Sequence, residues 1–283
     1  MLRPTVNPHS GHLDAAQPPM RTFKYRLVLL LLTLFSIQGF TDQRIDLVRV
    51  EAGKHGPDII YQIFDGRWGE TVNLSNNNKF DDFSPAIIRN AQGDLLVTWI
   101  EVANVDVSEI IYRKQTVKGW SAPEVIDTPH GQNTLPTLAL DKSGTIWCIW
   151  VGFDGTDDEI FAASMIKDKW SKPMRIYQQD NAVPDYQPTT SINNNGMVVV
   201  NWIRFDTEVS DYVDYRVAMR GIDDRGNPLW GAPEKVVANP LVSLGKVPRS
   251  FQLPEGVRDL QSVAIYLPSL PGQTLHYGRL HSR

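Results

Sequence analysis

Short apolar segments separated by polar clusters run along most of this chain. The segments are rich in Val, Ile, Trp, Tyr and Thr, and the clusters between them are made of Asn, Asp, Gly and Pro. Such segments predict β-strands, and such clusters predict the turns that join them. Outside the N-terminal region, no segment carries apolar residues at helical spacing over about ten positions. We therefore expect an all-β protein.

The segments recur with a period of about 51 residues, marked by the same residue types in the same order. A proline is followed eight residues later by a glycine, a tryptophan stands six residues beyond that glycine in three of the repeats, and a second tryptophan closes each repeat. Because these marks keep the same register, they indicate a structural repeat. They are Pro85, Pro136, Pro188 and Pro248; Gly93, Gly144, Gly196 and Gly256; Trp99, Trp150 and Trp202; and the closing Trp68, Trp120, Trp170 and Trp230.

The second repeat shows the strands that we expect in each unit. They are predicted at residues 135–140, 145–151, 159–166 and 170–177. Four antiparallel strands in a unit of ~40 to 50 residues match a β-propeller blade. A β-sandwich is the rival architecture, but it gives no reason for the same Pro, Gly and Trp positions to recur.

Incomplete repeats flank the three full ones. Residues 44–74 predict a second, third and fourth strand, and residues 248–280 predict a first, second and third. The strands are too many for four blades and too few for five, and we expect five irregular blades. Propellers commonly complete one blade with strands from both ends of the chain, which removes exposed sheet edges. An open array that closes only on dimerisation is the alternative.

A basic and then apolar segment precedes the repeats. In residues 20–39, Arg21, Lys24 and Arg26 stand ahead of an apolar run that is shorter than the ~20 residues needed to span a bilayer. We expect a disordered extension at 1–19, a secretory signal peptide at 20–39 and a single propeller domain at 40–283. The protein would then be secreted or periplasmic, without a membrane span after signal removal. The alternatives are an uncleaved N-terminal anchor and translation from Met20.

Composition restricts the partners. The chain has 28 Lys+Arg against 32 Asp+Glu, a formal net charge of -4, and no basic run that would bind a phosphate backbone. We therefore expect no nucleic-acid partner. A single cysteine, Cys148, excludes an intramolecular disulfide and a cysteine-rich zinc site, and its apolar neighbours predict a buried thiol.

The repeat resembles the blade of the sialidase superfamily of propellers. The resemblance covers residues 44–280 and is carried by Ser-Pro-Ala-Ile at 84–87, Gly-Asp-Leu-Leu-Val-Thr-Trp at 93–99, Ile-Ile-Tyr-Arg at 110–113 and Gly-Trp-Ser-Ala-Pro at 119–123. The family's Asp box is reduced here to its tryptophan, in FDGRW, TVKGW, MIKDKW and DDRGNPLW. The resemblance implies a propeller of degenerate Asp-box type.

The same resemblance argues against sialidase catalysis. Sialidases hold the substrate carboxylate with an arginine triad, whose first member usually stands two residues before the first-strand proline. In this chain that place is taken by Phe83, Thr134, Tyr186 and Lys246. The resemblance therefore implies a protein that is not an enzyme or, if it is one, a glycoside hydrolase.

One face of a propeller carries the loops between second and third strands together with the loops that lead into the next first strand. In this chain those loops are rich in Asp and Asn, which suit sugar hydroxyls or a calcium ion, although the same residues also simply form turns. The candidate ligand-binding residues are Asp82, His130, Asn133, Asp154, Asp185, Tyr186, Arg204 and Asp206.

These candidates have competing interpretations. Asp82, Asp154, Asp185 and Asp206 would serve glycoside hydrolysis if two of them converged to ~5 to 10 Å, and His130 is as well explained as an exposed, idle residue. Residues 154–159 form the best calcium-like cluster but lack the spacing of a known calcium loop, so we expect no metal and no cofactor, with calcium as the alternative. Tyr186 and Tyr212 are the best candidates for stacking on a sugar, whereas the repeat tryptophans are expected in the core between blades.

Three functions follow as hypotheses. The first is an exported, non-catalytic propeller that binds a glycan or an envelope or surface protein through its loop-rich face. The second is a divergent glycoside hydrolase that uses two carboxylates with separated pKa values. The third is a structural subunit of an envelope or surface assembly.

Overall fold

The computed structural model describes residues 44–76, 78–177, 183–224, 226–236, 263–266, 272 and 275–277. The chain divides into two compact units, Met1–Asp42 and Gln43–Arg283, and every described residue belongs to the second. The predicted extension at 1–19 and signal peptide at 20–39 lie outside the described residues. Within the described part of the chain all regular structure is β-strand, and no helix there is long and apolar enough to cross a membrane.

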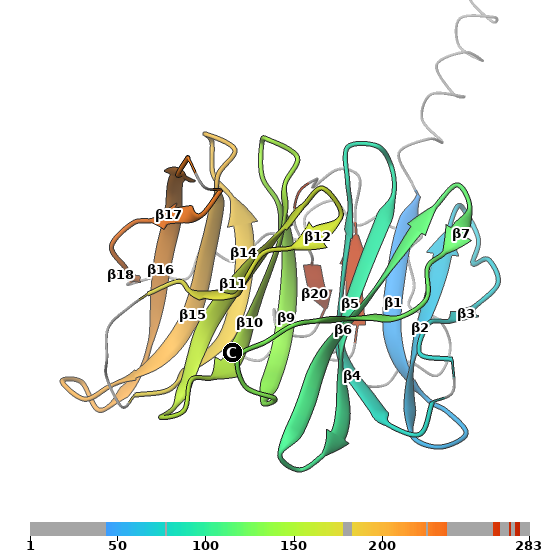
Figure 1. The fold of residues 1–283 in the computed structure, drawn as a ribbon, viewed down its shortest axis with the longest axis horizontal. Coiled ribbons are helices and arrows are strands. Elements are labelled where there is room, and N and C mark those ends of the chain that lie inside the picture. Colours follow the sequence, from blue (N-terminus) through green and yellow to red (C-terminus); the bar gives the residue numbers. More distant parts are fainter. Residues whose placement is uncertain are drawn as a thin grey trace, which may run out of the picture. The chain divides into compact units, whose positions relative to one another are not determined.

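Four antiparallel sheets form the described part of the fold (Figure 1). Three of them follow the repeats in chain order, so the all-β class is confirmed and the sheets are consistent with propeller blades. The first contains β4 (Asp81–Arg89), β5 (Leu95–Asn104), β6 (Val107–Thr116), β7 (Gly119–Trp120) and β8 (Glu124–Ile126). The second contains β9 (Asn133–Leu140), β10 (Ile146–Phe153), β11 (Asp158–Ile166), β12 (Lys169–Trp170) and β13 (Met174–Arg175). The third contains β14 (Asp185–Ile192), β15 (Val198–Asp206), β16 (Asp211–Ile222), β17 (Pro228–Trp230) and β18 (Glu234–Val236).

The outer strand of each repeat is broken into two short pieces. In the second repeat the first three predicted strands are found as β9, β10 and β11, but the single strand predicted at 170–177 is split into β12 and β13, which both pair with β11. Pro173 lies between the pieces and has no N–H for the ladder. Ser171 bridges the gap, because its backbone N–H donates to Ser164 O at 2.8 Å and its hydroxyl accepts from Ser164 N at 3.0 Å.

The fourth sheet joins the two ends of the repeat region. It contains β1 (Ile45–Ala52), β2 (Pro57–Phe64), β3 (Val72–Asn73), β19 (Val263–Tyr266) and β20 (Leu275–Tyr277), in the order β20-β19-β1-β2-β3. β1 pairs with β19 in antiparallel register. A sheet shared by both ends is the arrangement that closes one blade of a propeller. The strand predicted at 248–253 lies outside the described residues, and the count of five blades stays a prediction.

A β-bulge marks the first strand of all three full repeats. Ser84, Leu135 and Gln187 stand immediately before the repeat prolines and have positive φ angles of 51°, 52° and 51°. The strand registers shift at the same places. A residue with a side chain is strained at positive φ, and the proline that follows cannot donate to the ladder. In β4 and β9 the bulge therefore separates an apolar part of the strand from a polar beginning.

Aromatic residues fill the core within and between sheets. Trp99, Trp150 and Trp202 are almost wholly buried in the second strands. The closing Trp120 packs edge-on against Tyr61 of β2, in the sheet shared by both ends, with ring centroids 5.1 Å apart. The closing Trp170 packs in the same way against Tyr112 of β6, at 5.7 Å. The prediction that these tryptophans form the core is confirmed. Cys148 is fully buried, as predicted, and burial raises the pKa of its thiol.

Candidate functional site

The predicted ligand loops of each repeat meet at one end of its sheet. Successive strands run in opposite directions, so the turn between second and third strands lies beside the start of the first strand. The registers show this directly, because Asn133 at the start of β9 lies opposite Gly152 near the end of β10, and Asp185 at the start of β14 lies opposite Arg204 in β15. Figure 1 shows the β10–β11 and β15–β16 turns at the lower end of their sheets.

A buried polar residue begins the first strand of each full repeat. Asp82, Asn133 and Asp185 are at most 1% exposed. Trp99 Nε1 donates to Asp82 Oδ1 at 2.7 Å, and Trp202 Nε1 donates to Asp185 Oδ1 at 2.9 Å. These three candidate ligand residues are therefore buried at the same end of their respective sheets.

Asn133 holds the loop that precedes it. Its amide donates to Ser108 O at 2.9 Å, to Thr128 Oγ1 at 3.0 Å and to His130 O at 3.2 Å. Its side-chain nitrogen is therefore engaged in anchoring the loop that carries His130. The imidazole of His130 is exposed and contacts the ring of Phe153 edge-on at 6.2 Å.

Burial and the residue on the opposite strand both act on the pKa of the two buried aspartates. Burial raises the pKa of Asp82 to about 7, and Glu101, which lies opposite it, raises that pKa as well. Asp185 instead faces Arg204, whose Nε and Nη2 each lie 2.6 Å from one of its oxygens. Burial raises the pKa of Asp185, and the contact with Arg204 opposes that rise. The same position is thus a buried carboxyl that faces another carboxyl in one repeat and half of an ion pair in another.

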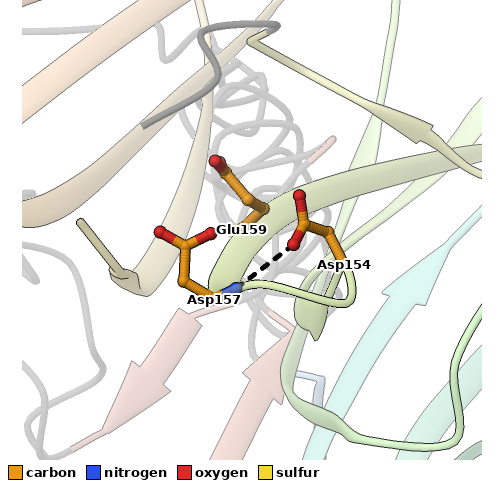
Figure 2. Close-up of side chains that lie close together, drawn as sticks. All are labelled: Asp154, Asp157 and Glu159. Atoms are coloured by element: carbon orange, nitrogen blue, oxygen red, sulfur yellow. Dashed lines mark hydrogen bonds between the residues drawn. The ribbon is translucent and has the colours of Figure 1, made fainter. Parts of the chain in front are cut away.

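Three further carboxyls lie on the turn that enters β11, and we call Asp154, Asp157 and Glu159 the acidic turn (Figure 2). One oxygen of each lies within 4.8 Å of the others. Asp154 accepts hydrogen bonds from the N–H groups of Thr156 and Asp157 at 2.8 and 3.2 Å. Arg175 donates to its other oxygen at 2.7 Å. Residue types alone pointed to this turn, but Arg175 was not predicted, because only the β11–β13 register brings it there.

The acidic turn contains carboxyls in contrasting environments. Asp157 and Glu159 are 9% and 1% exposed, and both oxygens of Asp157 and one of Glu159 have no hydrogen-bond partner among the described residues. Burial raises the pKa of Glu159 to about 8, with Asp185 and Asp157 adding to the rise, and burial also raises that of Asp157. Burial also tends to raise the pKa of Asp154, but the two N–H donors and Arg175 hold that pKa below its ordinary value.

An aromatic group, formed by Tyr186, Phe205 and Tyr212, lies at the same end of the third sheet. The ring of Tyr212 contacts Tyr186 at 6.3 Å and Phe205 at 5.5 Å between centroids. Tyr212 is 55% exposed and Phe205 is 37% exposed. Burial raises the pKa of Tyr186, with Tyr212, Asp158 and Asp157 adding to the rise, so these acids lie near its ring. The two predicted stacking residues are thus adjacent, and Phe205 joins them.

Asp206, the remaining candidate, is buried and belongs to a separate ion-paired cluster. Lys235 forms an ion pair with Asp206 and, at 3.2 Å, with Glu208. The N–H of Glu208 also donates to Asp206 at 2.8 Å. Of the four carboxylates considered for hydrolysis, Asp154 and Asp185 share the neighbourhood of Glu159, whereas the hydrogen bond of Asp82 to Trp99 and the ion pair of Asp206 with Lys235 lie elsewhere.

No family model and no curated protein sequence matches this chain. Solved structures resemble it in part. A protein of unknown function from Dyadobacter fermentans DSM 18053 is 13% identical, with 65% of this chain and 60% of that chain covered and a TM-score of 0.46. The GH93 α-L-arabinofuranosidase of Fusarium graminearum is 16% identical over 64% and 59%, with a TM-score of 0.47. The NanB sialidase from Streptococcus pneumoniae is 8% identical over 69% and 50%, with a TM-score of 0.47. This chain thus spans between 50% and 60% of these three chains.

Proposed function

We propose that this protein is an exported, non-catalytic propeller that binds a carbohydrate at the end of its second and third repeat sheets. The observation that carries the proposal is the exposed aromatic group beside Asp157 and Asp158. Export rests on the basic and apolar segment at 20–39.

The aromatic group has the chemistry that a sugar ring requires. A pyranose presents an apolar C–H face and an edge of hydroxyl groups, so its site combines an aromatic surface with a few polar groups. Tyr212 offers the exposed ring, with Tyr186 and Phe205 packed against it. Asp158, a partly exposed acid near Tyr186, supplies a hydrogen-bond acceptor for the hydroxyl edge.

Ion pairing at this end of the sheets favours binding over hydrolysis. A glycosidase needs an ionised carboxylate that is available to act as nucleophile or base. Asp154 is paired with Arg175, and Asp185 is held on both oxygens by Arg204. Their charges are therefore engaged within the fold.

A glycan array and a panel of glycoside substrates test the proposal together. We expect the wild type to bind one class of glycan without turnover and Tyr212→Ala to lose most of that signal. Phe80→Ala is the matched control, because Phe80 is an exposed aromatic, at 40%, outside the aromatic group. Hydrolysis of any glycoside would replace the proposal by the hydrolase alternative. Absence of both binding and turnover would favour an assembly subunit.

A further inference from the structure

We propose that the acidic turn binds one divalent cation, Ca²⁺ in preference to Mg²⁺, through oxygens of Asp154, Asp157 and Glu159 (Figure 2). This site does not rest on the carbohydrate-binding proposal: Asp157 lies near the aromatic group, but the cation would be held by the acidic turn and its binding requires no sugar.

Charge balance around the turn is incomplete. Four carboxyls gather here with two guanidinium groups. Arg204 donates through Nε and Nη2 to Asp185 and acts only at longer range on Asp157 and Glu159, and Arg175 donates to Asp154 and lies 4.0 Å from Glu159. The nearest imidazole is that of exposed His130, which acts on Asp154. Asp157 and Glu159 are therefore left without a cation at hydrogen-bond distance among the described residues. One divalent ion matches two carboxylates.

The same two residues hold the orphaned oxygens. Both oxygens of Asp157 and Oε1 of Glu159 are buried, with no hydrogen-bond donor among the residues that the structure describes. Buried carboxylates in folded proteins are ordinarily hydrogen-bonded, paired or bound to a metal, because desolvation without a partner is strongly unfavourable. A cation beside the turn supplies the missing partner for all three oxygens at once.

The type of ligand favours Ca²⁺ over Mg²⁺. Ca²⁺ binds about six to eight oxygens at about 2.3 to 2.6 Å in flexible geometry. The oxygens of the acidic turn lie within 4.8 Å of one another, so they can share one such coordination sphere. Mg²⁺ demands near-ideal octahedral geometry at about 2.0 to 2.1 Å and usually keeps several of its waters, so a set of protein carboxylates suits it less well. Water molecules would complete the coordination of Ca²⁺.

Calorimetric titration of chelator-treated protein with CaCl₂ and MgCl₂ tests the site. We expect one saturable Ca²⁺ site per chain and at least tenfold weaker Mg²⁺ binding. Asp157→Asn and Glu159→Gln should each weaken Ca²⁺ binding at least tenfold. The matched control is Asp106→Asn, which removes an exposed carboxyl from the β5–β6 turn of the preceding repeat and should leave the Ca²⁺ affinity unchanged. No saturable Ca²⁺ binding by the wild type, or equal losses in Asp157→Asn and Asp106→Asn, would overturn the proposal.

Thermal unfolding provides a readout that a purely structural carboxyl would not produce. In chelator, Asp157→Asn should unfold at a higher temperature than the wild type, because it removes an unbalanced buried charge. In saturating Ca²⁺ that order should reverse, because only the wild type gains the full stabilisation from the ion. An order of melting temperatures that is the same in chelator and in Ca²⁺ would contradict the proposal.

Discussion

Trp99 and Asp82 form a buried hydrogen bond of 2.7 Å between the second and first strands of their sheet, and Trp202 and Asp185 repeat it at 2.9 Å. In the intervening repeat Asn133 takes the place of the aspartate, and the indole N–H of Trp150 has no hydrogen-bond partner among the described residues. The aspartates at this position are therefore part of the architecture of the repeat. The residue opposite them decides how much each one stabilises the fold.

Asp82→Asn should stabilise the protein at alkaline pH. Burial raises the pKa of Asp82 from 3.8 to about 7, so between these values the folded protein binds a proton that the unfolded chain has released. The contribution of Asp82 to the free energy of unfolding therefore falls as pH rises from about 4 to about 7 and stays low above that range. The asparagine keeps an acceptor for Trp99 and carries no charge.

Urea unfolding at pH 5 and pH 8 measures this effect. We expect Asp82→Asn to exceed the wild type at pH 8 by about 1 to 3 kcal/mol, with a smaller difference at pH 5. A variant that is less stable than the wild type at pH 8 would show that the carboxylate is a net stabilising group at this position.

Arg204→Met should destabilise the fold strongly, because it leaves Asp185 buried without its bidentate partner. The expected loss in free energy of unfolding is about 3 to 5 kcal/mol. Adding Asp185→Asn should recover much of that loss, since the stranded charge disappears while the acceptor for Trp202 remains. Denaturant titrations of the wild type, the two single variants and the double variant give the coupling energy. A double variant no more stable than Arg204→Met would show that packing of the arginine side chain, over Tyr177 and Tyr215, carries the effect.

Gln187→Gly should stabilise the third repeat sheet. Gln187 is exposed and has a φ of 51°, so glycine removes the strain of that conformation without removing a buried contact. We expect a gain of about 0.5 to 1 kcal/mol, measured by urea unfolding. Thr134→Gly is the comparison, because Thr134 is an exposed strand residue without positive φ and should lose a similar amount. Equal destabilisation by both changes would mean that the bulge does not strain Gln187.

The strands were predictable because their apolar residues are bounded by turn-forming clusters. The first of the three strands expected within residues 44–74 is found as β1, and the first three strands expected in the second repeat match β9 to β11 closely. The break in each outer strand was missed, although Pro173 already signalled it. The bulges were not predictable, because Ser84, Leu135 and Gln187 share no side-chain property that favours positive φ.

The site was predictable only as a collection of loop residues. Topology placed Asp154, Tyr186 and Tyr212 at one sheet end, but the partner of each side chain depends on register across strands. A one-residue shift at the bulge decides whether Asp185 faces Arg204. Likewise, no residue pattern in the turn indicates that Asp157 is buried without a hydrogen-bond partner among the described residues.

Carbohydrate binding by the aromatic group is tested most directly by titrating the glycan selected on the array into wild-type protein, Tyr212→Ala and Phe80→Ala. In Tyr212→Ala, loss of the stacking ring is expected to reduce the binding free energy by about 1.4 kcal/mol, which is a tenfold larger dissociation constant. Phe80→Ala should bind as tightly as the wild type. The same dissociation constant for all three proteins would contradict the assignment of the binding surface.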